Sequence, residues 1–210
     1  MKPPIPDRAA DPVGNAPLVN LPNALTVLRV LCVPLLVVLL ALDEGARGPA
    51  RDWAAIVFVL ASVTDLMDGA IARRYGLVTT FGKIADPIAD KALTGVALIG
   101  LSILGDLPWW VTGIILVREI GVTLLRFWVI EHGVIPASRG GKLKTVVQTV
   151  AITMYLADVP LDWWPTASPM VMAVAVVLTV VTGLDYVVRA LRLRSQPIPT
   201  TSNLGVHREL

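Results

Sequence analysis

Residues 65–90 read DLMDGAIARRYGLVTTFGKIADPIAD, a stretch that sets four aspartates in largely apolar sequence. Asp65 and Asp68 are three residues apart, and Asp86 and Asp90 are four apart, so each pair shares one face of a helix. A charged side chain at the centre of a membrane helix costs about 2.5–3.5 kcal/mol on insertion scales. Such residues therefore face an interior or an aqueous cavity and mark a functional site. The natural counter-charge for four convergent carboxylates is a hard divalent cation.

The composition around this stretch is that of an integral membrane protein. Hydrophobic residues make up 55% of the 210, and the mean hydropathy of +0.70 is too high for an ordinary soluble domain. At about 20 residues per span, the length allows about six transmembrane helices and no separate soluble domain. The single cysteine, Cys32, excludes an intramolecular disulfide and is expected to be a packing residue.

Six apolar runs predict an all-α bundle of transmembrane helices, at residues 24–42, 53–72, 81–104, 107–130, 145–156 with flanking residues, and 170–188. Asn23 fits the N-cap of the first run, directly after Pro22. Residues 1–20 and 195–210 are expected to be flexible tails, so the membrane domain covers residues 21–194. The first tail lacks the continuous apolar core of a cleavable signal peptide.

The distribution of positive charge predicts the orientation of the six spans. The connectors expected on one side are residues 43–52, 105–108 and 157–168, whose only basic residues are Arg47 and Arg51. The other basic residues fall at the opposite side or in that half of the helices. By the positive-inside rule, both termini and the four acids are cytoplasmic, which puts a polar metal site in the cytoplasmic half of the bundle.

The opening stretch carries a pattern of eight fixed positions, Asp65-x2-Asp68-Gly69-x2-Ala72-Arg73-x8-Gly82-x3-Asp86-x3-Asp90. This pattern resembles the signature of the CDP-alcohol phosphatidyltransferase family at every position. Residues 21–29, 86–91, 118–120 and 141–145 also resemble segments of the bacterial members whose acceptor is sn-glycerol 3-phosphate. Together the similar segments cover about residues 21–150.

The resemblance implies a multi-pass enzyme of phospholipid synthesis in the bacterial plasma membrane, with its active site facing the cytoplasm. An alcohol attacks the β-phosphorus of CDP-diacylglycerol and releases CMP. With sn-glycerol 3-phosphate as the acceptor, the other product is phosphatidylglycerophosphate. The implied partners are the two substrates, membrane lipids and a second copy of the chain in a homodimer, but no nucleic acid.

A pyrophosphate is anionic, so carboxylates need metal ions between themselves and the donor. Asp65, Asp68, Asp86 and Asp90 suit Mg²⁺ or Mn²⁺, with two ions expected. Two ions about 3.5–4 Å apart clamp the attacking and leaving oxygens. Asp90 is the candidate general base on the acceptor hydroxyl, with or without a contact to the second metal.

The residues expected to bind the donor are small, polar or cationic. Glycine and alanine let a nucleotide approach the backbone closely, and a guanidinium suits phosphate. The set, which rests partly on the resemblance, is Asn23, Thr26, Arg29, Asp68, Gly69, Ala72, Arg73 and Gly82. For Asn23 the helix cap, and for Ala72 helix packing, are equally open interpretations.

The phosphate of the acceptor requires a cationic pocket of its own. The candidates are Arg118, Arg126, Lys142, Lys144 and Arg189, all in the expected cytoplasmic half. The alternative role for such residues is anchoring to anionic lipid headgroups, which is expected for Arg192 and Arg194.

Several functional alternatives stay open at this point. A related synthase would use the same donor with inositol phosphate or phosphatidylglycerol as the acceptor. A cation transporter or channel would use the acids as an ion site, and a membrane scaffold would have no catalysis at all. A purely structural bundle would neutralise the acids with Arg73, Arg74, Lys83 and Lys91.

Overall fold

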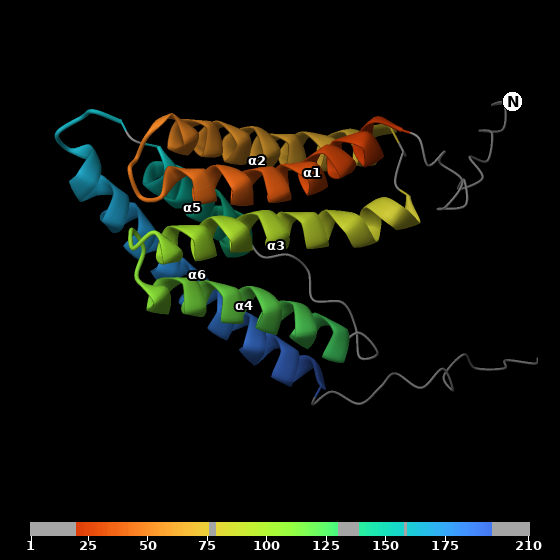
Figure 1. Cartoon of the computed structure of the whole chain (residues 1–210). Coiled ribbons are helices and arrows are strands. Elements are labelled where there is room, and N and C mark those ends of the chain that lie inside the picture. Colours follow the sequence, from red (N-terminus) through yellow and green to blue (C-terminus); the bar gives the residue numbers. More distant parts are fainter. Residues whose placement is uncertain (1–19, 76–78, 130–138, 158, 195–210) are drawn as a thin grey trace, which may run out of the picture.

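The computed structural model describes residues 20–75, 79–129, 139–157 and 159–194. Within these ranges the chain forms six α-helices: α1 (Leu21–Asp43), α2 (Pro49–Tyr75), α3 (Thr80–Ile103), α4 (Trp109–Trp128), α5 (Arg139–Leu156) and α6 (Trp164–Arg194). The helices run alternately in opposite directions, so Leu21 and Arg194 lie at the same end of the bundle (Figure 1). The all-α fold with six helices is confirmed. The tails expected at 1–20 and 195–210 lie outside the described residues, apart from Asn20.

The start of α1 differs from the sequence prediction, because Asn23 is not its N-cap. Asn20 takes that position with extended backbone, φ −140° and ψ 163°, and its side chain accepts a hydrogen bond of 2.9 Å from the backbone N–H of Asn23. Pro22 lies in the first turn, where a missing N–H leaves no helical hydrogen bond unmade. Asn23 is therefore inside the helix, and its side chain is available for other contacts.

Three helices begin at least four residues earlier than hydropathy predicts. α2 begins at Pro49, α5 at Arg139 and α6 at Trp164, against expected starts near 53, 145 and 170. Hydropathy marks only the apolar part of a helix, whereas the backbone hydrogen bonds continue through polar residues at its ends. The connector expected at 157–168 is correspondingly shorter, because its second half belongs to α6.

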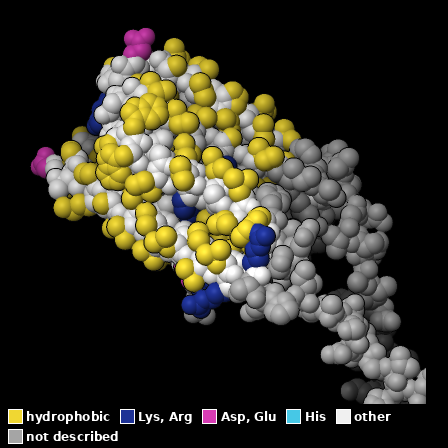
Figure 2. Space-filling view, turned by 90° about the horizontal axis from the view of Figure 1, so that it is seen from below, with side chains coloured by type: hydrophobic (Ala, Val, Ile, Leu, Met, Phe, Trp, Pro, Cys, Tyr) yellow, Lys and Arg dark blue, Asp and Glu magenta, His cyan; other side chains and the backbone are white. Residues whose placement is uncertain are grey.

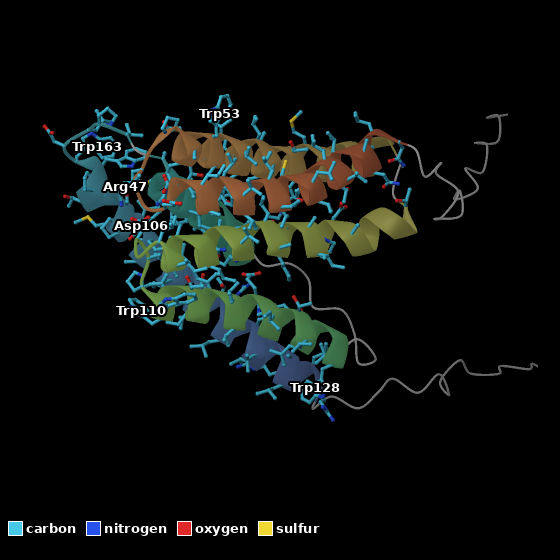
Figure 3. All side chains as sticks on the ribbon, in the orientation of Figure 1. Arg47, Trp53, Asp106, Trp110, Trp128 and Trp163 are labelled. Carbon is cyan, nitrogen blue, oxygen red and sulfur yellow. The ribbon has the colours of Figure 1, made fainter. Side chains whose placement is uncertain are left out.

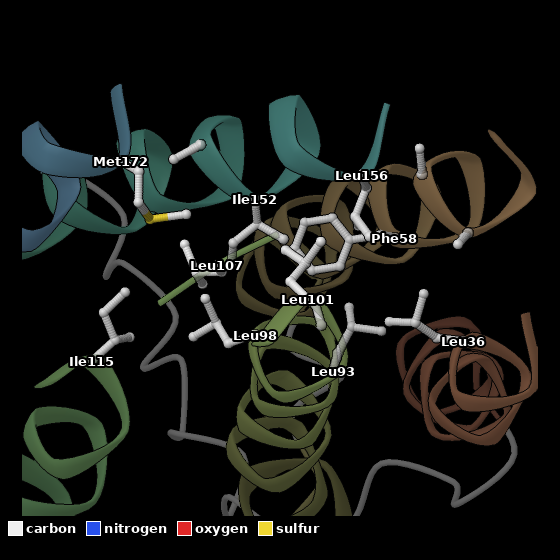
Figure 4. Close-up of a cluster of buried hydrophobic side chains, with 14 of the residues drawn as sticks. Leu36, Phe58, Leu93, Leu98, Leu101, Leu107, Ile115, Ile152, Leu156 and Met172 are labelled. Carbon is white, nitrogen blue, oxygen red and sulfur yellow. The ribbon is translucent and has the colours of Figure 1, made fainter. Parts of the chain in front are cut away.

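The bundle is built from two groups of three helices. α1 packs against α2 and α3, and α6 packs against α4 and α5, while α2 and α3 join the two groups through α4 and α5. Figure 4 shows the buried cluster at the join, to which all six helices contribute. Its members include Leu36, Leu40, Phe58, Leu93, Leu98, Leu101, Ile115, Ile152, Leu156 and Met172.

The outer surface of the bundle is apolar. Every helix exposes large hydrophobic side chains, and Figure 2 shows such side chains over most of one face with few charges among them. Soluble monomers rarely expose contiguous apolar surface of this extent. By length and composition, α1 and α6 are apolar enough to cross a membrane. These features fit a membrane protein.

Tryptophans mark both ends of the bundle. Trp53, Trp110 and Trp163 lie toward the end that carries the α1–α2 and α3–α4 connections, and Trp128 lies at the other end (Figure 3). Trp128 is also covered by the guanidinium of Arg194, 3.9 Å from its ring centroid. The 20 residues of α4 span roughly 30 Å, close to the thickness of a bilayer core. The aromatic side chains are therefore spaced as two interfacial belts would be.

A buried ionic cluster closes the end with the short connections. Arg51 is 1% exposed and its guanidinium lies 3.0 Å from Asp43, contacts Asp106 and donates a 3.1 Å hydrogen bond to the carbonyl of Tyr155. Arg47 reaches the same Asp106 at 2.7 Å, but its side chain is 51% exposed. The cluster thereby ties the α1–α2 connection to the α3–α4 connection and to the last turn of α5.

Asp106 lies outside the helices, between α3 and α4. Burial by itself raises the pKa of this carboxyl, but hydrogen bonds and charge from Arg47 and Arg51 outweigh burial and hold its pKa below the usual range. Asp106 is therefore ionised at neutral pH and serves as a permanent counter-charge for both arginines.

Removing the buried charge should destabilise the protein far more than removing the exposed one. We expect Arg51→Met to lower the free energy of unfolding by about 3–5 kcal/mol, because Asp43 is left as a buried, uncompensated carboxylate. Arg47→Met, the matched control on the same acceptor, should change it by about 0–1 kcal/mol. Thermal unfolding in detergent measures both, and equal losses would contradict the assignment of Arg51 as the structural cation.

Candidate active site

Side chains from α1, α2 and α3 meet at the end of the bundle opposite the ionic cluster. Arg29 of α1 is 1% exposed, and its guanidinium lies 2.6 Å from a carboxylate oxygen of Asp65 on α2. Thr26, one turn earlier on α1, donates a hydrogen bond to the carboxylate of Asp86 on α3. One face of α1 thus contacts both acid-bearing helices, because Thr26 and Arg29 are three residues apart.

The starts of α1 and α3 are tied together by a second polar contact. Thr79, the N-cap of α3, accepts a 3.0 Å hydrogen bond from the backbone N–H of Gly82 and donates one of 2.8 Å to the side-chain oxygen of Asn23. Both side chains are buried. Asn23 is therefore a contact between helices, beside the pair of Thr26 and Asp86.

Gly82 occupies the narrowest point of this contact. A Cβ atom at Gly82 would lie 3.1 Å from the side-chain oxygen of Asn23, 3.3 Å from Thr79 Oγ1 and 3.6 Å from Asp86 Oδ2. Real Cβ atoms rarely approach their neighbours so closely. A glycine at this position lets α3 pack against α1 while the polar groups still reach one another.

A cavity of about 600 Å³ opens between α2, α3, α4 and α5. Its polar wall is formed by Asp65, Asp90, Lys91, Glu119, Lys144 and Gln148. The rest of its lining is mostly apolar and includes Val59, Val63, Leu116, Ile120, Val146, Val150, Met154 and Trp164. The cavity is therefore amphipathic, with two of the four predicted acids at its polar part.

Glu119 of α4, which lines this cavity, contacts three cationic side chains. Its carboxylate contacts the ammonium of Lys144, lies 3.1 Å from the guanidinium of Arg118 and lies 3.8 Å from the ammonium of Lys91. The sequence did not predict the contacts of Glu119 with the two lysines. The available signal was an Arg118–Glu119 pair inside an apolar run, but neither lysine could be assigned to it from spacing, since α3, α4 and α5 contribute separately.

The five predicted acceptor-binding cations separate into different environments. Arg118 and Lys144 come together on Glu119, and Lys144 is buried. Lys142 is exposed, and Arg189 is exposed and lies 2.9 Å from Asp185. The side chain of Arg126 lies outside the described residues.

Comparison with known proteins identifies the family of this chain. The profile of the CDP-alcohol phosphatidyltransferase family matches residues 19–181. The chain belongs to this family. A probable phosphatidylglycerophosphate synthase of Mycobacterium tuberculosis is 55% identical over 181 residues, which cover 85% of each chain. The CDP-diacylglycerol–glycerol-3-phosphate 3-phosphatidyltransferase of Bacillus subtilis is 38% identical, and the match covers 80% of this chain and 93% of that protein. The enzyme of the same name from Rickettsia typhi is 37% identical, and the match covers 80% of this chain and 94% of that protein.

CDP-alcohol phosphatidyltransferases generally use divalent metal ions. In this chain the donor set fits such an ion by its chemistry, because Asp65, Asp86 and Asp90 offer only carboxylate oxygens. Arg29 and Thr26 orient two of these carboxylates, as residues behind metal ligands do. Among the side chains that the structure describes, no three acids, histidines or cysteines gather around one point. The fourth predicted ligand, Asp68, lies on α2, and its side chain is outside that description, as are those of Gly69, Ala72 and Arg73.

Gly82→Ala tests the close contact between α1 and α3. The new methyl group must displace the Asn23 amide or the Thr79 hydroxyl, so we expect the free energy of unfolding to fall by about 1–3 kcal/mol. Gly95→Ala on the same helix is the matched control, because its Cβ would meet only Leu116, at an ordinary 3.7 Å. Chemical denaturation in detergent compares the two. An equal response of both variants would show that Gly82 is not a required close approach.

Proposed function

We propose that this chain is a CDP-diacylglycerol–glycerol-3-phosphate 3-phosphatidyltransferase, which forms phosphatidylglycerophosphate and CMP in phospholipid biosynthesis. Family membership and the names of relatives at 37–55% identity support the assignment. The observation that carries it is the convergence of Thr26, Arg29, Asp65 and Asp86 beside an amphipathic cavity. An amphipathic cavity suits a donor with an anionic head and apolar chains.

The nucleotide end of the donor is assigned to the residues of the family pattern and to the face of α1 that contacts them. Arg73 and Arg29 supply positive charge near the phosphates, and Asn23, Thr26 and Asp68 supply polar contacts. Gly69, Ala72 and Gly82 allow close approach to the backbone. Donor binding by this set is supported by the contacts of Asn23, Thr26 and Arg29 with α2 and α3.

The reaction forms a bond between the acceptor hydroxyl oxygen and the β-phosphorus of the donor. The bond from that phosphorus to the bridging oxygen breaks, and CMP leaves with the electron pair. Asp90 takes the proton of the attacking hydroxyl, and its place in the cavity wall supports this role. When bound, one or two Mg²⁺ or Mn²⁺ ions held by Asp65, Asp68, Asp86 and Asp90 would neutralise the pyrophosphate charge.

The acceptor phosphate is assigned to a cationic region beside Asp90. Lys144 lines the same cavity as Asp90, and Arg118 joins Lys144 through Glu119. The remaining members of the proposed set are Arg126, Lys142 and Arg189. The diacylglycerol part of the donor is assigned to the apolar lining of the cavity, which is formed largely by valine, leucine and isoleucine side chains.

We further propose a homodimer in the bacterial plasma membrane, in which residues 21–194 form a six-span domain with both termini and the acids on the cytoplasmic side. The apolar outer surface and the tryptophans at both ends support the six spans. The charge distribution supports the orientation. Of the two basic residues expected outside, Arg51 is buried between Asp43 and Asp106, so it adds no exposed positive charge to that side.

CMP release by purified protein tests the assignment. With CDP-diacylglycerol and Mg²⁺, we expect turnover with sn-glycerol 3-phosphate and much less with inositol phosphate or phosphatidylglycerol. Chelation should abolish turnover, and Mg²⁺ or Mn²⁺ should restore it. CMP release with only another acceptor would show that the assigned acceptor is wrong, while the family assignment would stand. Metal flux in liposomes without any CMP release would favour a transporter.

The role of Asp90 has a separate test. Asp90→Asn should lower the turnover number by at least about 100-fold, because an amide cannot accept the proton of the attacking hydroxyl. Asp52→Asn, the same change on the exposed first turn of α2, should leave turnover unaltered. CMP release and thermal unfolding are measured for both. A fully active, folded Asp90→Asn protein would reject Asp90 as the general base.

A further inference from the structure

The single carboxylate of Glu119 lies near three cationic side chains. Its side chain is 17% exposed and contacts Lys144, which is 4% exposed, and Arg118, which is 16% exposed, with Lys91 at 3.8 Å. Arg118 and Lys144 both use the same carboxylate oxygen, Oε1. Buried cations without a counter-ion would be strongly destabilising, so the carboxylate keeps this part of the bundle stable before any ligand arrives.

Arg118 is held in place from α6. Its Nη2 donates a 3.1 Å hydrogen bond to Thr182, and a Cβ atom at the neighbouring Gly183 would lie 3.0 Å from its Cγ. Its Nε is buried and has no hydrogen-bond partner within the described structure. The guanidinium is therefore rigidly positioned and retains a donor beyond those that Glu119 and Thr182 use.

A second polar group without a hydrogen-bond partner in the described part of the chain, on Gln148, belongs to the lining of the cavity. Gln148 of α5 is 4% exposed and lines the cavity with Lys144 and Glu119, and its side-chain oxygen has no hydrogen-bond partner among the described residues. A buried acceptor of this kind is costly unless a ligand or water supplies a donor. A ligand with both an anionic group and a hydroxyl would satisfy the cations and this oxygen together.

We propose that Glu119 is a resident counter-ion, which holds Lys144 and Arg118 in the absence of substrate and releases them to the phosphate of the acceptor alcohol. The inference rests on the proposed function for the identity of that acceptor. A phosphate dianion and the carboxylate compete for the same N–H donors, and the dianion carries the larger charge. Glu119 is thus a positioning residue that sets the affinity for the acceptor, and an alcohol without a phosphate has nothing with which to displace it.

Glu119→Gln tests this role through the separate kinetic constants. The amide keeps the shape but removes the competing charge, so we expect KM for glycerol 3-phosphate to fall about 3- to 10-fold. The turnover number should stay within about twofold of the unmodified protein, as expected of a residue outside the reacting atoms. KM for CDP-diacylglycerol should not change. Asp52→Asn, an equivalent loss of charge in the exposed first turn of α2, should leave all three constants unaltered.

An unchanged or raised KM for glycerol 3-phosphate in Glu119→Gln would overturn the proposal. Should that variant fail to fold, the comparison moves to Lys144→Gln against the double variant Glu119→Gln/Lys144→Gln, in which no buried lysine is left without its carboxylate. The double variant should then show the lower KM, because Arg118 and Lys91 are still relieved of Glu119. A KM equal to or above that of Lys144→Gln would again overturn the proposal.

Calorimetric binding of inorganic phosphate separates this inference from the proposed function. We expect Glu119→Gln to bind phosphate about 3- to 10-fold more tightly than the unmodified protein, whichever alcohol is the true acceptor. Absence of turnover with glycerol 3-phosphate, together with tighter phosphate binding, would refute the assigned acceptor and support the counter-ion. Normal turnover with glycerol 3-phosphate, together with unchanged phosphate binding, would support the assigned acceptor and refute the counter-ion role of Glu119.

Discussion

The rest of the structure depends on the pairing of buried charges between helices. The guanidinium of Arg29, 2.6 Å from Asp65, forms one such pair. A charge inside an apolar bundle must have a partner, and the partner must come from another helix if it is also to hold the helices together. Arg51 meets the same requirement at the opposite end with Asp43 and Asp106, and Glu119 meets it between them. Helix positions are thus set by charge pairing as well as by apolar packing.

The clusters around Arg51 and Glu119 meet this requirement differently. Around Arg51, two carboxylates and a backbone carbonyl contact the two terminal nitrogens of the guanidinium, and these contacts join three segments of the chain. Around Glu119, one carboxylate serves three cations, beside a cavity that also exposes Asp90. The first arrangement gives its buried cation two carboxylates, whereas the second has more cations than carboxylates. The Arg51 cluster therefore joins helix ends and connections, whereas the Glu119 cluster borders the cavity.

The position of the cavity explains how one bundle can bring unlike substrates together. A lipid donor needs apolar surface for its chains and charge for its head, and the cavity lining contains both. The acceptor is small, soluble and anionic, so it needs the cationic part alone. Asp90 and Lys144 line the same cavity, so the proposed general base and part of the proposed acceptor site belong to one space. Catalysis in such a site is chiefly a matter of positioning and charge.

The sequence by itself determined the six helices, the spacing of the acids and the family, because hydropathy and the fixed positions between Asp65 and Asp90 are local properties of the chain. It did not determine the partners of the charged side chains. Asp65 is paired with Arg29, and Glu119 with Lys144, across helices that are adjacent only after folding. It also left open whether Asn23 caps its own helix. That interpretation was wrong, because Asn20 is the N-cap and the side chain of Asn23 accepts a hydrogen bond from Thr79 at the start of α3. Tertiary packing decided these contacts, because burial makes an unpaired polar group costly and only the folded bundle defines which groups are buried together.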